Sequence, residues 1–433
     1  MSLMKRYVMI LLTCMLLLAG CASDSKPPAE TTPIADVTQD NVQTPVISQT
    51  EKPIPVDPVE EMLSKMTLEE KVGQMFFIAC RRDADGNPVI TADDAVSGLI
   101  ARYHPGGFVL FAENISTIPQ TQGLIQGLQD ASKIPLFISV DEEGGIVSRL
   151  NKAQEMHSTK MPDAYTIGLT DNPDYAYQVA EAIAQELYSL GFNMDFAPVC
   201  DIFTNPDNTV IGKRAYGSEP AKVSLMVSRA VEGFKDGQII PVLKHFPGHG
   251  DTLADSHTGA AEVTHDRKRL DTTELIPFME GIEAGAEVIM TAHILLPNIT
   301  KEQVPASLSS EIITGILREN MGFDGIVITD ALEMSAIAAF FEEDEAVVKA
   351  VEAGVDMLLM PSKLDNAYAA LLKAVSDGRI SEARIDESVR RILALKMKYQ
   401  LLSGEPRRPD PEEVLGSEEH QELARKIRED AKP

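Results

Sequence analysis

One short segment of the chain concentrates the residues that are best suited to chemistry. Residues 244–257 contain three histidines, two aspartates and one lysine, together with two glycines and one proline. Lysine and aspartate are rarely fully buried unless they are paired, and proline and glycine interrupt regular structure. A conformationally restricted segment that is rich in titratable groups predicts an active-site loop.

Within this segment, Asp255 and His257 form a candidate pair for proton transfer. Side chains two residues apart point the same way in an extended segment, so Asp255 could orient and polarise His257. An imidazole with an ordinary pKa near 6.5 gives and takes protons near neutral pH. The alternative is a solvated loop histidine beside an aspartate. The neighbouring glycines and proline favour the functional interpretation, because a loop that closes over a substrate needs hinge points.

Other candidate residues lie at the ends of apolar runs. Asp330 ends the run 325–330, where a carboxylate could act as a nucleophile or an electrostatic stabiliser, or could cap the following helix. Lys244 and His245 end another run and could hydrogen-bond sugar hydroxyls. Arg149 and Arg214 follow two further runs, where an exposed arginine is usually only solvated.

The elements that must position these residues alternate along the chain. Amphipathic helical segments separate eight short apolar runs, which predict parallel strands buried on both faces. The predicted strands are 75–79, 107–112, 136–141, 194–199, 241–245, 288–293, 325–330 and 357–361. Eight such units predict an α/β fold, a (β/α)8 TIM barrel. Polar residues at the carboxyl ends of at least five strands favour this barrel over an open sheet, whose site would gather at one switch point.

The two ends of the chain differ from this middle part. Residues 1–20 have a basic start and an apolar run too short to span a bilayer, and they end Leu-Ala-Gly before Cys21, which resembles the bacterial lipobox. We therefore expect a lipoprotein signal peptide, lipidation of Cys21 and a location on the extracytoplasmic face of the cell membrane; an ordinary secretory signal is the alternative. Residues 21–57 predict a disordered tether, 58–402 the catalytic domain, and 403–433 a linker and a terminal helix.

The composition of the chain excludes some classes of partner and site. The formal net charge of −27 argues against a nucleic-acid partner, because phosphate contacts need clustered Lys and Arg. Cys80 and Cys200 are expected to be small buried residues rather than a disulfide, and no Cys-x-x-Cys pair indicates a metal or redox site. We expect a monomer without metal or cofactor. Basic residues late in the helical segment 381–402, including Lys396, are expected to complement the helix dipole.

Several segments together resemble one enzyme family. Residues 244–257 resemble the signature of bacterial β-N-acetylglucosaminidases of glycoside hydrolase family 3, with Lys-His-Phe-Pro-Gly-His-Gly-Asp-Thr followed by Ser and His. Segments 66–75, 141–149, 211–217 and 322–334 are also similar to that family. The resemblance covers roughly residues 58–402. Many larger family members continue into a second domain, and residues 403–433 look like the lead-in to it.

The resemblance implies a retaining exo-β-N-acetylglucosaminidase that acts on peptidoglycan-derived muropeptides or chitooligosaccharides. Asp330 matches the nucleophile, His257 the general acid/base and Asp255 its partner. Five further positions match the family's residues that bind the terminal N-acetylglucosamine: Asp141, Arg149, Arg214, Lys244 and His245. Retaining glycosidases usually pair two carboxylates, and here a histidine would replace one of them. A neutral imidazole repels anions less than a carboxylate does. Some phosphorolysis is therefore expected.

Two other functions compete with this one. A metal-dependent barrel hydrolase could use His245, His249, His257 and His293 as zinc ligands, but the first predicted strand ends without a His-x-His pair. A lipid-anchored sugar-binding protein would fit the N-terminus and the acidic charge. It gives no reason for Asp330 to occur together with the Asp255–His257 pair.

Overall fold

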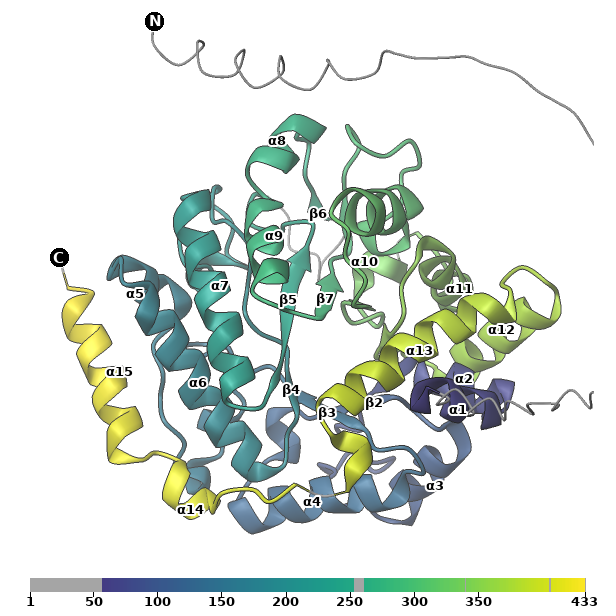
Figure 1. Cartoon of the computed structure of the whole chain (residues 1–433), viewed down its shortest axis with the longest axis horizontal. Coiled ribbons are helices and arrows are strands. Elements are labelled where there is room, and N and C mark those ends of the chain that lie inside the picture. Colours follow the sequence, from purple (N-terminus) through teal and green to yellow (C-terminus); the bar gives the residue numbers. More distant parts are fainter. Residues whose placement is uncertain (1–56, 253–260, 339, 405, 433) are drawn as a thin grey trace, which may run out of the picture. The chain divides into compact units, whose positions relative to one another are not determined.

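Eight parallel strands lie at the centre of the fold, and their order around the ring follows the chain (Figure 1). The computed structural model describes residues 57–252, 261–338, 340–404 and 406–432. A bridge between Ile328 and Met357 brings the first and last strands of the sheet together, so the predicted (β/α)8 barrel is confirmed. The strands are β1 (Phe76–Ile78), β2 (Gly107–Val109), β3 (Phe137–Val140), β4 (Met194–Asp195), β5 (Ile240–Phe246), β7 (Val288–Thr291), β9 (Ile326–Thr329) and β10 (Leu358–Leu359).

Helices surround these strands and separate them along the chain, as the amphipathic segments predict (Figure 1). The segment Glu311–Asn320 is wound as a π-helix. A short parallel pair, β6 (Ala261–Glu262) and β8 (Ile294–Leu295), lies outside the barrel sheet. The α-helices are α1 (Pro58–Lys65), α2 (Leu68–Gln74), α3 (Asp94–Tyr103), α4 (Ile118–Ala131), α5 (Ala164–Leu169), α6 (Pro173–Leu190), α7 (Pro220–Asp236), α8 (Arg267–Thr272), α9 (Ile276–Glu283), α10 (Ser335–Ala338), α11 (Glu343–Ala353), α12 (Leu364–Ser376), α13 (Glu382–Lys398), α14 (Pro411–Val414) and α15 (Glu418–Asp430).

Local sequence signals set several helix ends. Thr67 and Glu70 form a reciprocal capping box at the start of α2, which satisfies two backbone N–H groups that would otherwise lack partners. Gly191 ends α6 with φ of +114°, a left-handed conformation that residues with a Cβ atom adopt only with strain. This turn directs the chain from α6 into β4.

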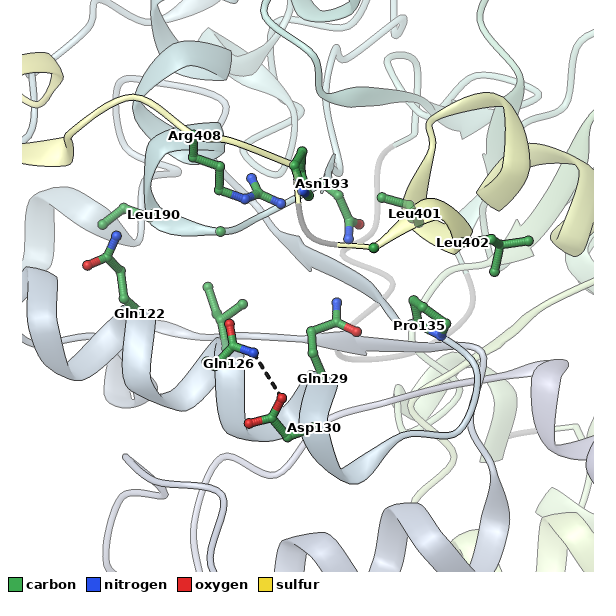
Figure 2. Close-up of a pocket in the computed structure, with 14 residues that line it drawn as sticks. Gln122, Gln126, Gln129, Asp130, Pro135, Leu190, Asn193, Leu401, Leu402 and Arg408 are labelled. Carbon is green, nitrogen blue, oxygen red and sulfur yellow. Dashed lines mark hydrogen bonds between the residues drawn. The ribbon is translucent and has the colours of Figure 1, made fainter.

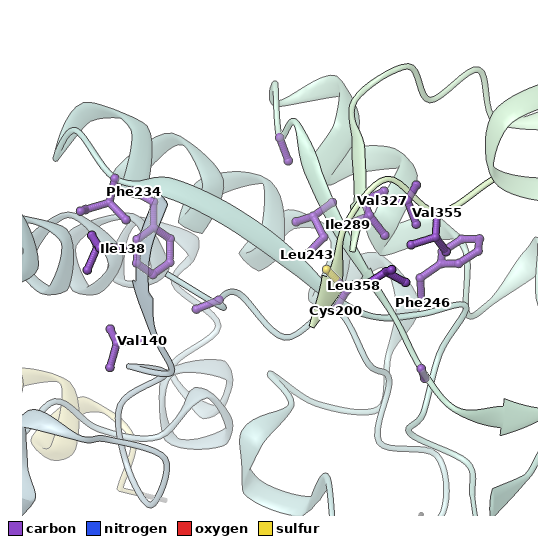
Figure 3. Packing of buried hydrophobic residues seen from close by; sticks show 14 of the residues in the cluster. Ile138, Val140, Cys200, Phe234, Leu243, Phe246, Ile289, Val327, Val355 and Leu358 are labelled. Carbon is purple, nitrogen blue, oxygen red and sulfur yellow. The ribbon is translucent and has the colours of Figure 1, made fainter. Parts of the chain in front are cut away.

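The hydrophobic core has two layers, separated by the barrel wall. Alternate residues of a strand point to opposite faces, so Val327 packs outward against the helices while Ile326 and Ile328 fill the barrel interior. Figure 3 shows part of the outer layer, where Val327, Ile289 and Leu243 come from neighbouring strands. This arrangement fixes which side chains can reach the mouth of the barrel.

Helix α13 closes the amino-terminal end of the barrel. Its Ile392 and Leu395 belong to the same buried cluster as Phe137 and the other interior residues. The next residue, Lys396, is fully buried. Its Nζ atom donates to Gln74 Oε1 at 2.8 Å and lies 5.1 Å from the centroid of the Phe137 ring. Lys396 and Lys398 lie in the last turn of α13, as expected, and Lys396 is turned into the barrel end.

The terminal helix α15 packs beside α5 and α6 (Figure 1). Buried His420 of α15 lies with its Nδ1 atom 3.1 Å from Glu186 Oε1 on α6. The same carboxylate accepts hydrogen bonds from the backbone N–H and the hydroxyl of Thr159. A polar cluster thus joins the end of the described chain to the barrel wall.

Both cysteines in the described residues are free thiols, as expected. Cys200 is buried, whereas Cys80 is only half-buried, because it lies just beyond the end of β1. Among the described helices, none has the length and apolar character needed to cross a bilayer. The predicted signal peptide, Cys21 and nearly all of the tether lie outside the described residues.

Candidate active site

The carboxyl ends of the strands bring the predicted site residues together at one mouth of the barrel. Asp141 follows β3, and Asp330 directly follows β9. Lys244 and His245 are among the last three residues of β5. The register of a parallel barrel places these positions at the same end. The sequence-based prediction that strand ends carry the site residues therefore agrees with the topology.

An ionic network around Lys244 forms one side of this mouth. Lys244 is only 1% exposed, and its Nζ atom lies 2.7 Å from Asp141 Oδ1 and 2.6 Å from Glu143 Oε1. Glu143 also binds the Arg214 guanidinium through both of its oxygens, at 2.7 and 2.9 Å. Arg149 approaches the other oxygen of Asp141 at 3.3 Å. Four of the five predicted sugar-binding residues thus share one network of three cations and two carboxylates.

Each group in the centre of this network is held in its charged form. Burial acts to raise the pKa of Glu143, but Arg214 and Lys244 hold that pKa far below its ordinary value. Burial acts to lower the pKa of Lys244, but Asp141 and Glu143 raise it above the ordinary lysine value. A buried charge is stable only when it is paired in this way, so the network presents fixed, preorganised donors and acceptors to a ligand.

The fifth predicted sugar-binding residue, His245, links this network to Asp201. The Nδ1 atom of His245 lies 2.7 Å from Asp201 Oδ2, and its Nε2 atom lies 3.3 Å from the Arg214 guanidinium. If Nδ1–H donates to the carboxylate, Nε2 is left as an acceptor for Arg214. Asp201 Oδ1 also accepts the backbone N–H of His249 at 2.6 Å. Asp201 therefore fixes both the histidine ring and the start of the loop that follows β5.

Asp330 lies beside these groups and is partly buried. Its Oδ1 atom accepts the backbone N–H of Ala331 at 2.8 Å. The next helix, α10, begins only at Ser335, so the alternative interpretation of Asp330 as a helix cap is wrong. Burial acts to raise the pKa of Asp330, yet His245 and His293 lower it below the ordinary aspartate value. The structure thus holds an anionic carboxylate at the barrel mouth.

The remaining histidines of the barrel mouth are held by neighbouring polar groups. His293 Nδ1 lies 2.7 Å from the Ser307 hydroxyl, and its Nε2 lies 3.1 Å from the Ala331 carbonyl oxygen. His249 Nδ1 lies 2.9 Å from the Thr252 hydroxyl. Over the part of the chain that the structure describes, no group of three or more His, Cys, Asp or Glu side chains is arranged to hold a metal ion.

The predicted pair Asp255 and His257 lies outside the described residues. The described residues on either side of it are bonded to each other: Asp251 Oδ2 lies 2.6 Å from His265 Nε2. The Thr204 hydroxyl donates to the other oxygen of Asp251 at 2.6 Å. The described residues that flank positions 253–260 are therefore joined at the same edge of the barrel that carries Lys244.

Sequence reasoning assigned no specific role to Glu143, Asp201 or Phe111, although Asp201 is among the charged residues at the predicted strand ends. Glu143 lies in the acidic run directly after β3, and a charged residue next to a buried strand is the signal that could have identified it. Two cations lie over the ring of Phe111, with the guanidinium carbon of Arg81 4.5 Å and that of Arg149 5.7 Å from the ring centroid. An aromatic residue just after β2 gave no comparable signal.

A separate cavity of about 350 Å³ lies at the opposite end of the barrel. Residues that precede β3 and β4, including Pro135 and Asn193, line it together with α4 and the segment from Leu401 to Arg408 (Figure 2). Gln126 donates to Asp130 at 2.9 Å along one wall. None of the predicted site residues lines this cavity, so the candidate site is the ionic mouth described above.

We expect Glu143→Gln to weaken ligand binding more than it slows the chemical step. The neutral amide no longer balances the charges of Lys244 and Arg214, so these two donors lose their fixed positions. The value of KM for an aryl N-acetylglucosaminide should rise about ten-fold, which corresponds to about 1.4 kcal/mol. Glu113→Gln, which alters a carboxylate on a partly exposed ion pair with Arg81, is the control. A ten-fold fall in kcat at constant KM would contradict this role.

Comparisons with known proteins agree with this arrangement. The family model described as the glycosyl hydrolase family 3 N-terminal domain matches residues 67–395. Beta-hexosaminidase A of Pseudoalteromonas piscicida is 38% identical over 336 residues, which are 71% of this chain and 56% of that protein. Beta-hexosaminidase LpqI of Mycobacterium tuberculosis is 33% identical over 339 residues, covering 76% of this chain and 82% of that protein.

A solved structure gives the same result in three dimensions. A glycoside hydrolase family 3 β-N-acetylglucosaminidase from a Paenibacillus species has a TM-score of 0.79 and 41% sequence identity, over 84% of this chain and 69% of that one. The chain spans only a little over half of the Pseudoalteromonas protein. Since the family model covers most of the barrel and contains every residue of the ionic mouth, the chain belongs to glycosyl hydrolase family 3.

Proposed function

We propose that this chain is a retaining exo-β-N-acetylhexosaminidase that removes terminal N-acetylglucosamine from muropeptides or chitooligosaccharides. The observation that carries the proposal is the anionic Asp330 beside the buried network of Lys244, Glu143 and Arg214. Fixed charged donors and acceptors suit a sugar with several hydroxyls, and a carboxylate beside them suits attack on its anomeric carbon. The names of the two relatives and of the Paenibacillus enzyme support the same activity.

The proposed reaction has two displacement steps. Asp330 attacks the anomeric carbon while the imidazolium of His257 gives its proton to the departing glycosidic oxygen, so one C–O bond forms as the other breaks. A water molecule then attacks the glycosyl ester, and neutral His257 takes its proton. Asp255 orients the imidazole throughout. Asp141, Arg149, Arg214, Lys244 and His245 hold the terminal sugar.

Turnover of a chromogenic N-acetylglucosaminide by the intact chain is the first test. Proton NMR during early hydrolysis should show the β-anomer of N-acetylglucosamine, because two inversions retain configuration. Initial release of the α-anomer would contradict the retaining mechanism. Measurable sugar binding with no turnover would favour the sugar-binding protein. Activity that disappears in a chelator and returns with zinc would favour the metal-dependent hydrolase.

His257→Ala should have an effect that depends on the leaving group. A general acid matters most when the departing oxygen is a poor leaving group. We therefore expect kcat/KM to fall at least a hundred-fold for a disaccharide, but much less for a dinitrophenyl glycoside. Replacement of the described histidine His157, which lies outside the ionic mouth, by alanine is the control. Equal losses on both substrates would contradict the acid role of His257.

Phosphate should compete with water in the second step, because a neutral histidine repels it less than a carboxylate would. We expect N-acetylglucosamine 1-phosphate among the products at high phosphate concentration. Mass spectrometry of the reaction mixture measures this product directly. Hydrolysis alone at every phosphate concentration would contradict this part of the proposal.

The N-terminal part of the proposal concerns location. We propose that Cys21 is lipidated and that the enzyme works as a monomer on the extracytoplasmic face of the cell membrane. The lipobox-like residues before Cys21 support this. Fatty-acid labelling of the full chain that is lost in Cys21→Ala tests the anchor, and sedimentation of the Cys21→Ala chain tests the monomer.

A further inference from the structure

The loop between β3 and the 3-10 turn Leu150–Lys152 carries several of the charged groups of the ionic mouth. Asp141 and Glu143 lie at its start, and Arg149 lies at its end. The fold must bring these two ends together, because the Arg149 guanidinium lies 3.3 Å from Asp141 Oδ2. The backbone N–H of Glu143 donates to the Val147 carbonyl oxygen at 2.9 Å, but this bond closes the turn two residues before Arg149. Another contact must therefore fix the backbone of Arg149.

The side chain of Glu142 makes this contact. Its Oε2 atom accepts the backbone N–H of Arg149 at 2.7 Å and that of Leu150 at 3.1 Å. Both N–H groups stand at the start of the 3-10 turn, where a helix supplies no acceptor of its own. The backbone of Glu142 is held in turn, because its N–H donates at 2.9 Å to Oδ1 of Asp195, a fully buried residue of β4. Glu142 thus connects the barrel wall to the backbone that carries Arg149.

The position of the Arg149 side chain depends on this backbone. The guanidinium reaches Asp141 at 3.3 Å and lies over the ring of Phe111, 5.7 Å from its centroid. Groups that bind a substrate must be held close to their productive positions by hydrogen bonds from residues behind them. A displacement of about 1 Å, caused by a change away from the reacting atoms, can cost about a hundred-fold in rate. Glu142 is placed to prevent such a displacement of Arg149.

The surroundings of Glu142 are buried and contain other acidic groups. Its residue is only 5% exposed. Asp195 faces it from β4 and Glu186 from α6, while the Ser148 hydroxyl bonds to it from the loop itself. Among the cations of the mouth, Lys244 acts on Asp195. Burial raises the pKa of Glu142 to about 7, so the carboxyl group changes its charge near neutral pH.

From these contacts we propose that Glu142 is a positioning residue for sugar binding, which holds the Arg149 guanidinium in place through the backbone of Arg149 and Leu150. Glu142 itself does not contact the sugar. This inference rests on the proposed function, in which Arg149 binds the terminal sugar. Hydrogen bonds to an ionised acceptor are about twice as strong as those to a neutral one. Ionised Glu142 therefore holds the loop more firmly, and sugar affinity rises as the pH rises through about 7.

Steady-state kinetics of the full chain on an aryl N-acetylglucosaminide give the first test. Glu142→Ala leaves the two N–H groups without their acceptor, so KM should rise about ten-fold while kcat stays within about two-fold. Glu142→Gln keeps an oxygen that can accept both N–H groups, and KM should stay within about three-fold of its original value. Glu155→Gln, which alters an exposed carboxylate a few residues later, is the matched control and should change neither quantity.

The pH dependence of binding separates positioning from a purely structural role. N-acetylglucosamine, titrated calorimetrically, should bind the unaltered chain about three-fold more tightly at pH 8 than at pH 6. The affinity of Glu142→Gln should lack this dependence, because the amide carries no charge at either pH. Any contribution from His257 is common to both chains, so the difference between them reports on Glu142. A purely structural role would lower the melting temperature and leave the same pH dependence in both chains.

Amide hydrogen exchange, measured by mass spectrometry, makes the result independent of turnover. The peptide that contains Arg149 and Leu150 should exchange faster in Glu142→Ala than in the unaltered chain. An unchanged KM in folded Glu142→Ala, or equal pH dependence in Glu142→Gln and the unaltered chain, would overturn the assignment. If Glu142→Ala does not fold, the titration of Glu142→Gln decides. Failure of the unaltered chain to cleave the substrate or to bind the sugar would instead refute the proposed function, and the exchange would still decide whether Glu142 holds the loop.

Discussion

Asp330→Asn should reduce kcat by at least about a thousand-fold. The amide cannot form the glycosyl ester, and removing a covalent nucleophile removes the whole two-step route. KM should change little, because the sugar is proposed to bind through the network around Lys244. Steady-state kinetics on the chromogenic substrate measure both quantities.

A matched control separates this effect from a loss of folding. Asp324, six residues earlier and just before β9, is 93% exposed in its side chain and pairs with Arg391. Asp324→Asn should keep its kcat within about two-fold, since surface ion pairs contribute about 1 kcal/mol or less. Thermal unfolding of both variants should resemble that of the unaltered chain. Near-normal turnover by a folded Asp330→Asn variant would exclude Asp330 as the nucleophile.

The electrostatics of Asp330 also predict part of the pH profile. Because its pKa is lowered in the folded protein, Asp330 stays ionised as the pH falls to about 4, the ordinary aspartate value. Stability that depends on its charge is present above that value and is lost only as the pH falls through the lower folded pKa. Asp330 therefore gives kcat/KM no acid limb between pH 5 and 7. The proposed acid His257 must carry its proton in the first step, so kcat/KM should fall as the pH rises through the histidine range.

Lys396→Met should stabilise the protein by about 2 kcal/mol at pH 7. Burial lowers the pKa of Lys396 to about 7. In the unfolded chain the pKa of a lysine is about 10.4, so protonation of Lys396 is much less favourable in the folded state. Each unit of that difference costs about 1.4 kcal/mol. Part of the gain is offset because Gln74 Oε1 loses its donor, which costs about 1–3 kcal/mol. The melting temperature should rise by about 2–3 °C.

The sign of the pH dependence distinguishes this cause from improved packing. The unfolded state binds one more proton than the folded state between about pH 7 and 10.4, so the unaltered chain loses stability as the pH falls through that window. The advantage of Lys396→Met should accordingly be smallest near pH 10 and largest at pH 7. Lys398→Met, two residues later and 56% exposed, should show no such trend. A destabilised Lys396→Met variant with no pH trend would contradict the conclusion that burial of the Lys396 ammonium group costs stability.

The sequence predicted the barrel because its signals are local. Each buried strand is a short apolar run, and each helix shows amphipathic periodicity, so all eight strands were placed correctly. The observed strands are shorter than the predicted ones at several ends; β10, for example, covers two residues where five were expected. Backbone pairing ends where the twisted neighbouring strand diverges, and hydrophobicity alone does not indicate that point.

The site could be predicted only in part, since its contacts join distant segments. Glu142 and Glu143 are adjacent in sequence, and nothing local distinguishes them. In the fold, Glu142 turns away and accepts the backbone N–H groups of Arg149 and Leu150, while Glu143 turns toward Lys244. The contact between Arg214 and His245 likewise depends on how the 3-10 turn Gly212–Arg214 meets the end of β5. The burial of Lys396 was not predicted, because helical periodicity does not reveal that α13 lies across the barrel end.

The seal that α13 forms at the amino-terminal end of the barrel has a kinetic consequence. With Ile392 and Leu395 filling that end, the sugar and its leaving group share a single opening. In the proposed mechanism the leaving group departs first, because the sugar stays bonded to Asp330 until the second step. Free N-acetylglucosamine is then the last product to leave and meets each incoming substrate in the same passage. Product inhibition by this sugar should therefore be competitive, and the enzyme should slow as its own product accumulates.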